Sequence, residues 1–193
     1  MQARVRIVAP MDSASPVRSI RGVSLVELLT VIGIVAILTA IGLPSYQYVT
    51  SRNRISGEIN GLLGDLQYAR AEAIKEGQTV SVCVSNGTTC LPSSAWQSGW
   101  MVFSDLNGTG VYVAGPGENI LRVQAPFTST DTFGASNNVQ AIIFNREGFA
   151  QGLPAGGVLI TLDANPPSTA STRCLALTLV GMMTVQTYGG GCL

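Results

Sequence analysis

The fold of this chain is decided by the stretch RGVSLVELLTVI at residues 21–32. It opens an apolar run over residues 23–43, in which Glu27 is the only charged side chain. A helix of this length rises roughly 30 Å, which matches the hydrocarbon thickness of a bilayer. Because a carboxylate inside such a segment costs roughly 2.5 kcal/mol or more, Glu27 needs a partner or a function. The run therefore predicts a membrane-spanning helix that does more than anchor the chain.

A basic residue and a glycine stand directly before the apolar run, with the carboxylate five residues after the glycine. This arrangement resembles the processing signature of type IV pilins and type II secretion pseudopilins. The resemblance implies that a prepilin peptidase cuts between Gly22 and Val23 and that the new amine of Val23 is methylated. It also implies that Glu27 pairs with the terminal amine of a neighbouring subunit during filament assembly. Val23 stands where this family more commonly has Phe or Met.

A secretory signal peptide and a plain membrane anchor are the alternative interpretations of the apolar run. A secretory signal has an apolar region of about 7–15 residues and a small-residue cleavage site after it. Here the run is longer, contains Glu27, and ends in Ile-Gly-Leu-Pro at residues 41–44. A plain anchor would leave Glu27 without a function. The pilin-type interpretation is therefore favoured.

Charge is distributed unevenly along the chain. The expected leader, residues 1–22, carries four Arg and one Asp, whereas residues 23–193 carry 7 basic and 10 acidic side chains. Since basic residues before an apolar span stay in the cytoplasm, we expect the residues after it to lie outside. The resemblance to pilins then implies a single-pass inner-membrane protein whose C-terminal domain lies in the periplasm. The negative balance of the remaining chain gives no general attraction for nucleic acid. Met11 is a second candidate start, which would shorten the leader.

The chain has no histidine, which removes the commonest general base and metal ligand. Its four cysteines lie in the part expected outside the cytoplasm, at Cys83, Cys90, Cys174 and Cys192. An even count in an oxidising compartment favours disulfides, and the spacings do not match zinc-binding pairs. Three connectivities are possible. The pairing of Cys83 with Cys90 and of Cys174 with Cys192 is favoured because each closes a local loop, and two pairs of free buried thiols are the alternative.

The helix is expected to continue past the apolar run as far as Glu76. Apolar residues recur there at alternating spacings of four and three, at Ile55, Ile59, Leu62, Leu66, Ala69 and Ala73. This spacing is typical of one buried helix face, and Gly77 is a natural C-terminal stop. Gly42 and Pro44 are expected to bend or loosen the helix, because Pro removes a backbone donor and crowds the preceding turn.

Beyond Gln78 the chain changes to short runs rich in β-branched and aromatic residues, separated by Gly, Pro, Asn and Ser. Strands are predicted at 79–84, 100–104, 119–124, 139–145, 158–162, 174–179 and 183–187. Val alternates with Thr, Ser and Cys in the first of them, which predicts a half-buried strand. The predicted fold class is therefore α+β. A long N-terminal helix, transmembrane over 23–43 and amphipathic over 44–77, packs on an antiparallel β-sheet domain at 78–193.

This order of elements also resembles the FimT/FimU-type minor pilins and the H-type minor pseudopilins over most of the mature chain. The similarity is carried by ARAEAI at 69–74, GWMVF at 99–103, DLNG at 105–108, ILRV at 120–123 and FNREG at 144–148. It implies a minor pilin of a type IV pilus that helps to initiate or cap the filament, in twitching motility and adhesion. A type II secretion minor pseudopilin is the alternative. The implied partners are other pilins through the N-terminal helix, the prepilin peptidase and methyltransferase, and the inner membrane.

Three other functions find little support in the sequence. The segment DLNGTG at 105–110 has too few acidic side chains for a calcium loop, and its Asn-Gly pair predicts a hairpin turn. DNA receptors among FimT-like pilins carry a Gly-Arg-x-Arg turn near the C-terminus, whereas residues 181–184 read Gly-Met-Met-Thr, so DNA binding is not expected. No nucleophile with a suitable base is visible, so we expect no enzymatic activity, no cofactor and no metal site.

Overall fold

The computed structural model of the protein describes residues 22–192. The leader expected at 1–22 therefore lies outside the described residues apart from Gly22, and so does the alternative start at Met11. The described residues fall into two compact units, which divide after Pro44, and each is considered by itself.

The first element is a single helix, α1 (Leu25–Glu76). Its length and composition over the apolar run are those of a helix that can cross a membrane. Gly42 and Pro44 both lie inside it, and the backbone stays helical through them. The bend expected at these two residues stays a prediction.

The folded unit contains nine strands in two antiparallel sheets. The five-stranded sheet has the order β3-β2-β1-β5-β6, and the four-stranded sheet has the order β4-β7-β8-β9. The bounds are β1 (Val80–Val84), β2 (Trp100–Ser104), β3 (Ile120–Gln124), β4 (Thr132–Ala135), β5 (Ala141–Phe144), β6 (Ala150–Gln151), β7 (Val158–Asp163), β8 (Arg173–Leu177) and β9 (Met183–Thr187). Two short 3-10 helices lie at Trp96–Ser98 and Ser136–Asn138.

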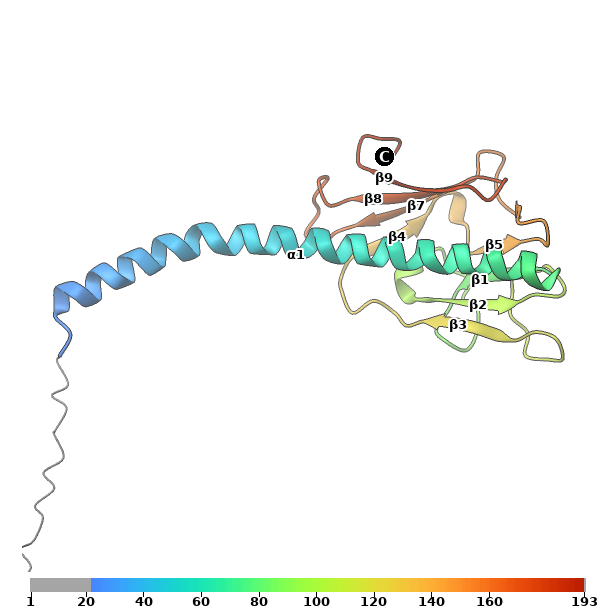
Figure 1. Cartoon of the computed structure of the whole chain (residues 1–193), viewed down its shortest axis with the longest axis horizontal. Coiled ribbons are helices and arrows are strands. Elements are labelled where there is room, and N and C mark those ends of the chain that lie inside the picture. Colours follow the sequence, from blue (N-terminus) through green and yellow to red (C-terminus); the bar gives the residue numbers. More distant parts are fainter. Residues whose placement is uncertain (1–21, 193) are drawn as a thin grey trace, which may run out of the picture. The chain divides into compact units, whose positions relative to one another are not determined.

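The C-terminal half of α1 runs along both sheets and closes the core between them (Figure 1). Its buried side chains are those predicted from the apolar spacing, namely Ile55, Ile59, Leu62, Leu66, Ala69 and Ala73. Each of them is at most 1% exposed and belongs to one core cluster with side chains of both sheets. The helix ends before Gly77, whose φ of +66° is the left-handed conformation of a helix stop. The predicted α+β arrangement is therefore confirmed.

Each of the predicted strand segments overlaps an observed strand, with ends that differ by two residues at most. The sequence did not indicate β4 or β6. β4 has one large apolar side chain, Phe133, followed by Gly134, and β6 has two residues only. Neither is long enough for the alternation of period two by which strands are recognised.

The prediction that the first strand is half-buried is wrong, because every residue of β1 is at most 1% exposed. Its valines face the main core. On the other face Cys83 joins a second apolar cluster, which includes Phe103 and the half-buried Tyr112. Ser81 Oγ donates to Asp105 Oδ2 at 2.7 Å. The connection from β2 to β3, which contributes Asp105 and Tyr112, thus covers the face that the alternation assigned to solvent.

The same connection corrects the hairpin expected at Asn107-Gly108. Gly108 N donates to Asp105 O at 3.2 Å, so a turn is present, but it opens a loop of residues 105–119 and not a tight hairpin. The carboxylate of Asp105 accepts bonds from Thr109 N at 3.1 Å and Gly110 N at 2.7 Å. These bonds hold the chain in a loop before β3 returns to pair with β2.

Candidate assembly segment and surface sites

The residues expected at the processing site lie immediately before α1. Gly22, Val23 and Ser24 are exposed and not helical, and Ser24 O accepts the bond from Leu28 N at 3.0 Å that begins the helix. Val23 is 68% exposed. The Gly22–Val23 peptide bond is thus accessible and lies in backbone free of helical hydrogen bonds, which a peptidase needs for its substrate.

Glu27 lies in the first turn of α1. A carboxylate is favoured there because the helix N-terminus carries partial positive charge. Within residues 22–192 Glu27 takes part in no ion pair. Its charge is therefore available to a group from outside this part of the chain.

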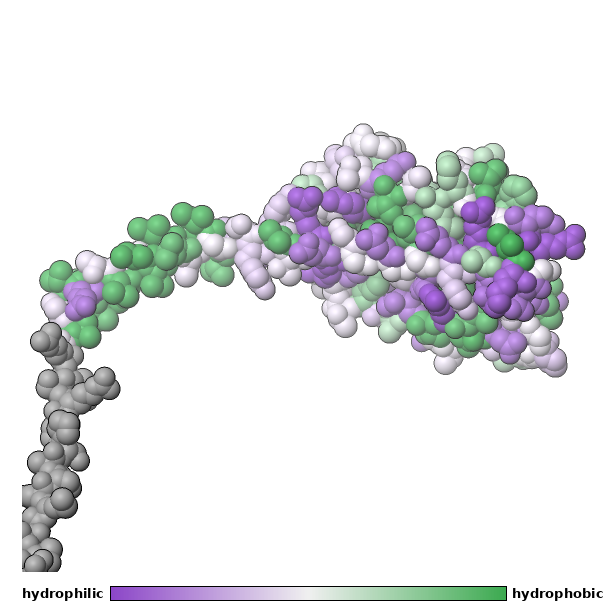
Figure 2. Space-filling view, viewed as in Figure 1, coloured by the Kyte–Doolittle hydropathy of each residue, from purple (hydrophilic) through white to green (hydrophobic). Residues whose placement is uncertain are grey.

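Every residue of the apolar run is exposed. Figure 2 shows that the visible face of this part of the helix is mostly hydrophobic. Each of its large apolar side chains is at least 51% exposed, namely Val23, Leu25, Val26, Leu28, Leu29, Val31, Ile32, Ile34, Val35, Ile37, Leu38, Ile41 and Leu43. A helix that is apolar all round needs lipid or other helices around it.

The four cysteines form two disulfides, between Cys83 and Cys90 and between Cys174 and Cys192. They join neighbours along the chain, the connectivity that closes local loops. The first ties β1 to the loop that follows it, and the second ties β8 to the C-terminal loop. No cysteine is left as a free thiol or metal ligand.

Within the part of the chain that the structure describes, no three or more acidic or cysteine side chains come together as a metal site would require. Asp105 is the acidic residue of the segment at 105–110, and it is fully buried. Its oxygens accept hydrogen bonds from Ser81, Thr109 and Gly110. This carboxylate organises the loop.

Two ion pairs fasten α1 to the rest of the folded unit. Arg54 donates to both oxygens of Asp131, at 2.6 and 2.8 Å. Burial opposes ionisation of Asp131, but the bonds from Arg54 and from Asn165 N outweigh it and hold its pKa below the usual value. Beside them, burial and the charge of Asp131 raise the pKa of Glu58.

The second pair centres on Asp65. It accepts a hydrogen bond from Trp100 Nε1 at 2.9 Å and one from Arg122 at 3.0 Å. The guanidinium of Arg122 also lies 3.8 Å from the ring centre of Tyr68. The Asp65 carboxylate on α1 thereby bonds to both β2 and β3. Asp65 and Arg122 thus help to pack the helix on the sheet.

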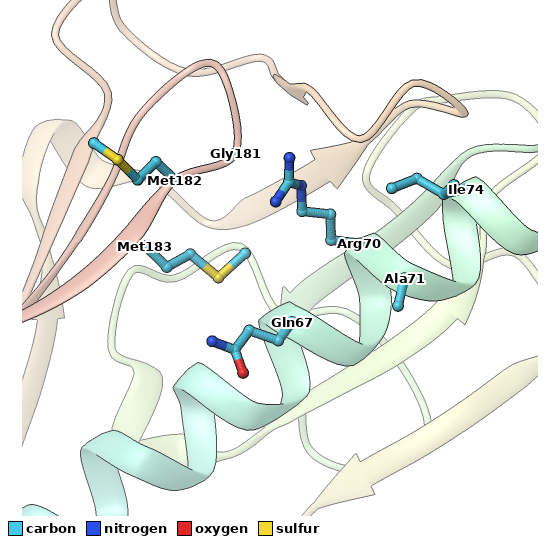
Figure 3. Close-up of a pocket in the computed structure, with 7 residues that line it drawn as sticks. All are labelled: Gln67, Arg70, Ala71, Ile74, Gly181, Met182 and Met183. Carbon is cyan, nitrogen blue, oxygen red and sulfur yellow. The ribbon is translucent and has the colours of Figure 1, made fainter.

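An open cavity of about 440 Å³ lies between α1 and the turn from β8 to β9 (Figure 3). Its lining is Gln67, Arg70, Ala71, Ile74, Gly181, Met182 and Met183. Arg70 Nε donates to Gly148 O at 2.8 Å and Nη2 donates to Val180 O at 3.3 Å. The sequence did not identify this site, because its parts are about a hundred residues apart. The available signal was the pair of adjacent methionines, Met182 and Met183, after Gly181.

The folded unit is similar to known proteins in sequence and in structure. The family model described as Type II transport protein GspH matches residues 58–181, more than half of the chain. The crystal structure of the type IV minor pilin FimU of Pseudomonas aeruginosa (strain PAO1) has a TM-score of 0.56 at 23% identity, over 72% of this chain and 93% of that one. This likeness shows the pilin-like fold.

The minor pseudopilin EpsH from the type 2 secretion system of Vibrio cholerae aligns with a TM-score of 0.42 and 10% identity, over 69% of this chain and 97% of that one. A search of curated protein sequences gave no match. Because the family model spans the helix end and most of both sheets, the chain belongs to the FimT/FimU/GspH-like family of pilin-type proteins.

Proposed function

We propose that the protein is a minor pilin of a type IV pilus, which a prepilin peptidase processes and which helps to initiate or cap the filament. One observation carries the proposal. An exposed apolar helix with a single carboxylate in its first turn leads directly into a folded unit of the GspH-type family. Neither a plain anchor nor a signal peptide accounts for Glu27.

Processing depends on the backbone around Gly22. Cleavage after this residue would free the amine of Val23, four residues before Glu27 and at the start of the apolar segment. Inside a filament that amine would be surrounded by apolar helices, where an unpaired charge is expensive. Glu27 of an adjacent subunit would neutralise it, so the same carboxylate that opposes membrane insertion stabilises the assembled filament.

We further propose that the protein is anchored in the bacterial inner membrane with its folded unit in the periplasm. The basic residues before the apolar run favour this orientation. Two disulfides in the folded unit favour an oxidising compartment. Pilin-type proteins are structural, and we assign the chain no catalytic role.

A type II secretion minor pseudopilin is the second candidate, and the description of the matching family favours it. A clean deletion in the native host separates the two, scored for surface pili with twitching and for secretion of folded exoproteins. Loss of pili with intact secretion, restored by the wild-type gene, is the result that we expect. Loss of secretion with normal pili would assign the protein to the pseudopilus.

DNA uptake has less support than either assembly function. The turn at residues 181–184 has no arginine, and Met182 is 57% exposed in it. Arg122 and Arg146 are each paired with a carboxylate. A gel-shift measurement with duplex DNA tests this expectation, and tight binding at physiological salt would contradict it.

A further inference from the structure

The cavity in Figure 3 combines one arginine with exposed apolar side chains. In this view the guanidinium of Arg70 lies between Met182 and Ile74 and faces the turn that contains Gly181. Met182 is 57% exposed and Ile74 is 51% exposed. A cation beside apolar side chains can bind a carboxylate that stands next to an apolar group, through paired N–H donors and apolar contact together.

Two glycine turns close on Arg70 and fix its position. Gly148 and Gly181 have φ values of +82° and +76°. A Cβ at Gly181 would collide with Gly148 O and with Arg70 Nε, and a Cβ at Gly148 would lie 2.8 Å from a methyl group of Ile74. Both turns therefore need glycine, and the guanidinium is held between their carbonyl groups.

The charge of Arg70 has no carboxylate partner within residues 22–192, since its hydrogen bonds end on backbone carbonyls. Arg54, Arg122 and Arg146 are each paired with Asp or Glu. Arg52 and Arg173 also have no carboxylate partner in this part of the chain, but neither lines the cavity. A guanidinium has about five N–H donors, and these two bonds leave the others for a ligand. The cavity thus offers both a charge and donors to an incoming carboxylate.

The two turns carry three more exposed apolar side chains besides Met182, namely Phe149, Leu179 and Val180. Together with Ile74 of α1, these side chains are 39–57% exposed. The two turns are joined where Ala150 N donates to Leu179 O at 2.9 Å. Figure 2 shows hydrophobic side chains near this end of the folded unit, where α1 ends. Exposed apolar side chains that gather around a cavity on a folded domain are typical of an interaction site.

We propose that the cavity docks a neighbouring pilin-type subunit, which inserts a segment with an Asp or Glu beside an apolar side chain. The inference rests on the proposed function, because it takes the partner from the same filament. The carboxylate pairs with Arg70, and the apolar side chain packs on Met182 and Met183, whose flexible thioethers adapt to its shape. Nucleic acid fits less well, because the cavity has one guanidinium and residues 45–193 carry 7 basic and 9 acidic side chains.

The test is photo-cross-linking in the native host, with benzoylphenylalanine at Ile74 of the full-length chain. We expect a cross-linked pilin-type subunit, with the attachment point within a few residues of an Asp or Glu by mass spectrometry. The cross-linking yields of Met182→Glu and Met182→Lys then distinguish an effect of the sign of the charge from an effect of any polar side chain at this position. The glutamate should repel the partner and reduce the yield at least about tenfold, whereas the lysine should keep it within about twofold. Val113→Glu, at another exposed site, should have no effect.

A second probe at Val31, in the apolar run, separates this inference from the proposed function. Cross-links to other subunits from Val31 but none from Ile74 would overturn the docking site and leave the proposed function standing. No cross-link from either position would overturn both. Equal yields from Met182→Glu and Met182→Lys would overturn recognition of a carboxylate, and so would cross-linked nucleic acid at Ile74. Both disulfides on a non-reducing gel show that each variant is folded.

Discussion

At position 27 a carboxylate lies in the first turn of a helix whose neighbouring side chains are apolar and exposed. Membrane insertion and filament assembly make opposite demands on this residue. Insertion favours an apolar side chain, whereas an assembled filament that buries the amine of Val23 needs an anion close by. The proposed role in assembly would account for a carboxylate at this position.

Replacing Glu27 with Ala should leave cleavage intact and reduce incorporation into filaments at least about tenfold, because the buried amine loses its partner. Immunoblots of sheared filaments and of membranes measure the two quantities. Glu76→Ala makes the same chemical change at the other end of α1 and should be incorporated normally. Normal incorporation of the Glu27 variant would rule out its role in assembly.

Replacing Gly22 with Leu should leave an uncut precursor in the membrane, because the peptidase would have to accommodate a bulky side chain at a position where its substrate has glycine. The readout is the size of the protein on a gel and the mass of its N-terminal peptide. Gly33→Leu is the matched control, since Gly33 also has open space around it and lies inside the apolar run. A processed band of normal size from the Gly22 variant would refute the cleavage site.

The candidate assembly residues could be proposed from the sequence because they lie within six positions of one another. The cavity at Arg70 could not, because its hydrogen-bond partners Gly148 and Val180 are 78 and 110 residues away. The sequence shows such an arginine as one more charged residue on a helix face. The carbonyl groups of Gly148 and Val180 reach the Arg70 guanidinium only in the folded structure, where their two turns lie beside α1.

At the scale of the element, the C-terminal half of α1 is stabilised mainly by its buried face. Leu62 is fully buried in the core cluster shared with both sheets. Leu62→Ala should lower the free energy of unfolding by roughly 2–5 kcal/mol and the Tm by about 5–15 °C. Thermal unfolding of the detergent-solubilised chain measures this. Val49→Ala, at a site on the same helix that is 51% exposed, should change the Tm little, and an equal effect of the two would contradict the assigned core.

Asp131 and Glu58 lie where α1 contacts residues 129–131, and their pKa values are shifted in opposite directions. Removing the charge of each should therefore change the free energy of unfolding at pH 7 in opposite directions. Asp131 has a lowered pKa, so its contribution is present above the ordinary Asp pKa and is lost as pH falls through the lower folded value. Asp131→Asn should therefore destabilise by about 1–3 kcal/mol at pH 7. Glu58 has a raised pKa and a buried Oε2 without a hydrogen-bond partner, so Glu58→Gln should stabilise at pH 7.

Both differences from the wild type should shrink in acid. The Glu58 difference shrinks as pH falls through its raised folded pKa and is gone below the ordinary Glu value, whereas the Asp131 difference starts to shrink below the ordinary Asp pKa and is gone below its lowered folded value. Urea unfolding at a series of pH values measures them. A Glu58→Gln variant that is less stable than the wild type at pH 7 would show that this carboxylate is satisfied.

The elements themselves were predictable to different degrees. The period of the helix face and the alternation in β1 are local patterns, and both were visible in the sequence. That β1 is covered on both faces depends on the loop at 105–119, and no local pattern reports it. β4 and β6 exist because neighbouring strands pair with them, so four and two residues are enough.

At the scale of the whole molecule, the order of a long helix followed by short strand segments was sufficient for the α+β class, whereas the family was indicated by the signature at residues 21–32 and by the short motifs between residues 69 and 148. The strand order was not predictable. β1 lies between β2 and β5 in the five-stranded sheet. β4, which follows β3 in the chain, belongs to the four-stranded sheet and pairs with β7. These choices follow from long-range pairing, which a single sequence does not record.

The proposed function requires that the chain is cut after Gly22 and built into a surface pilus. The most direct measurement is mass spectrometry of filaments sheared from the native host, with the N-terminal peptide of this chain as the readout. We predict that the peptide begins at Val23 and carries a methylated amine. Absence of the chain from sheared pili that are otherwise intact would contradict the account, and so would a peptide that retains residues before Val23.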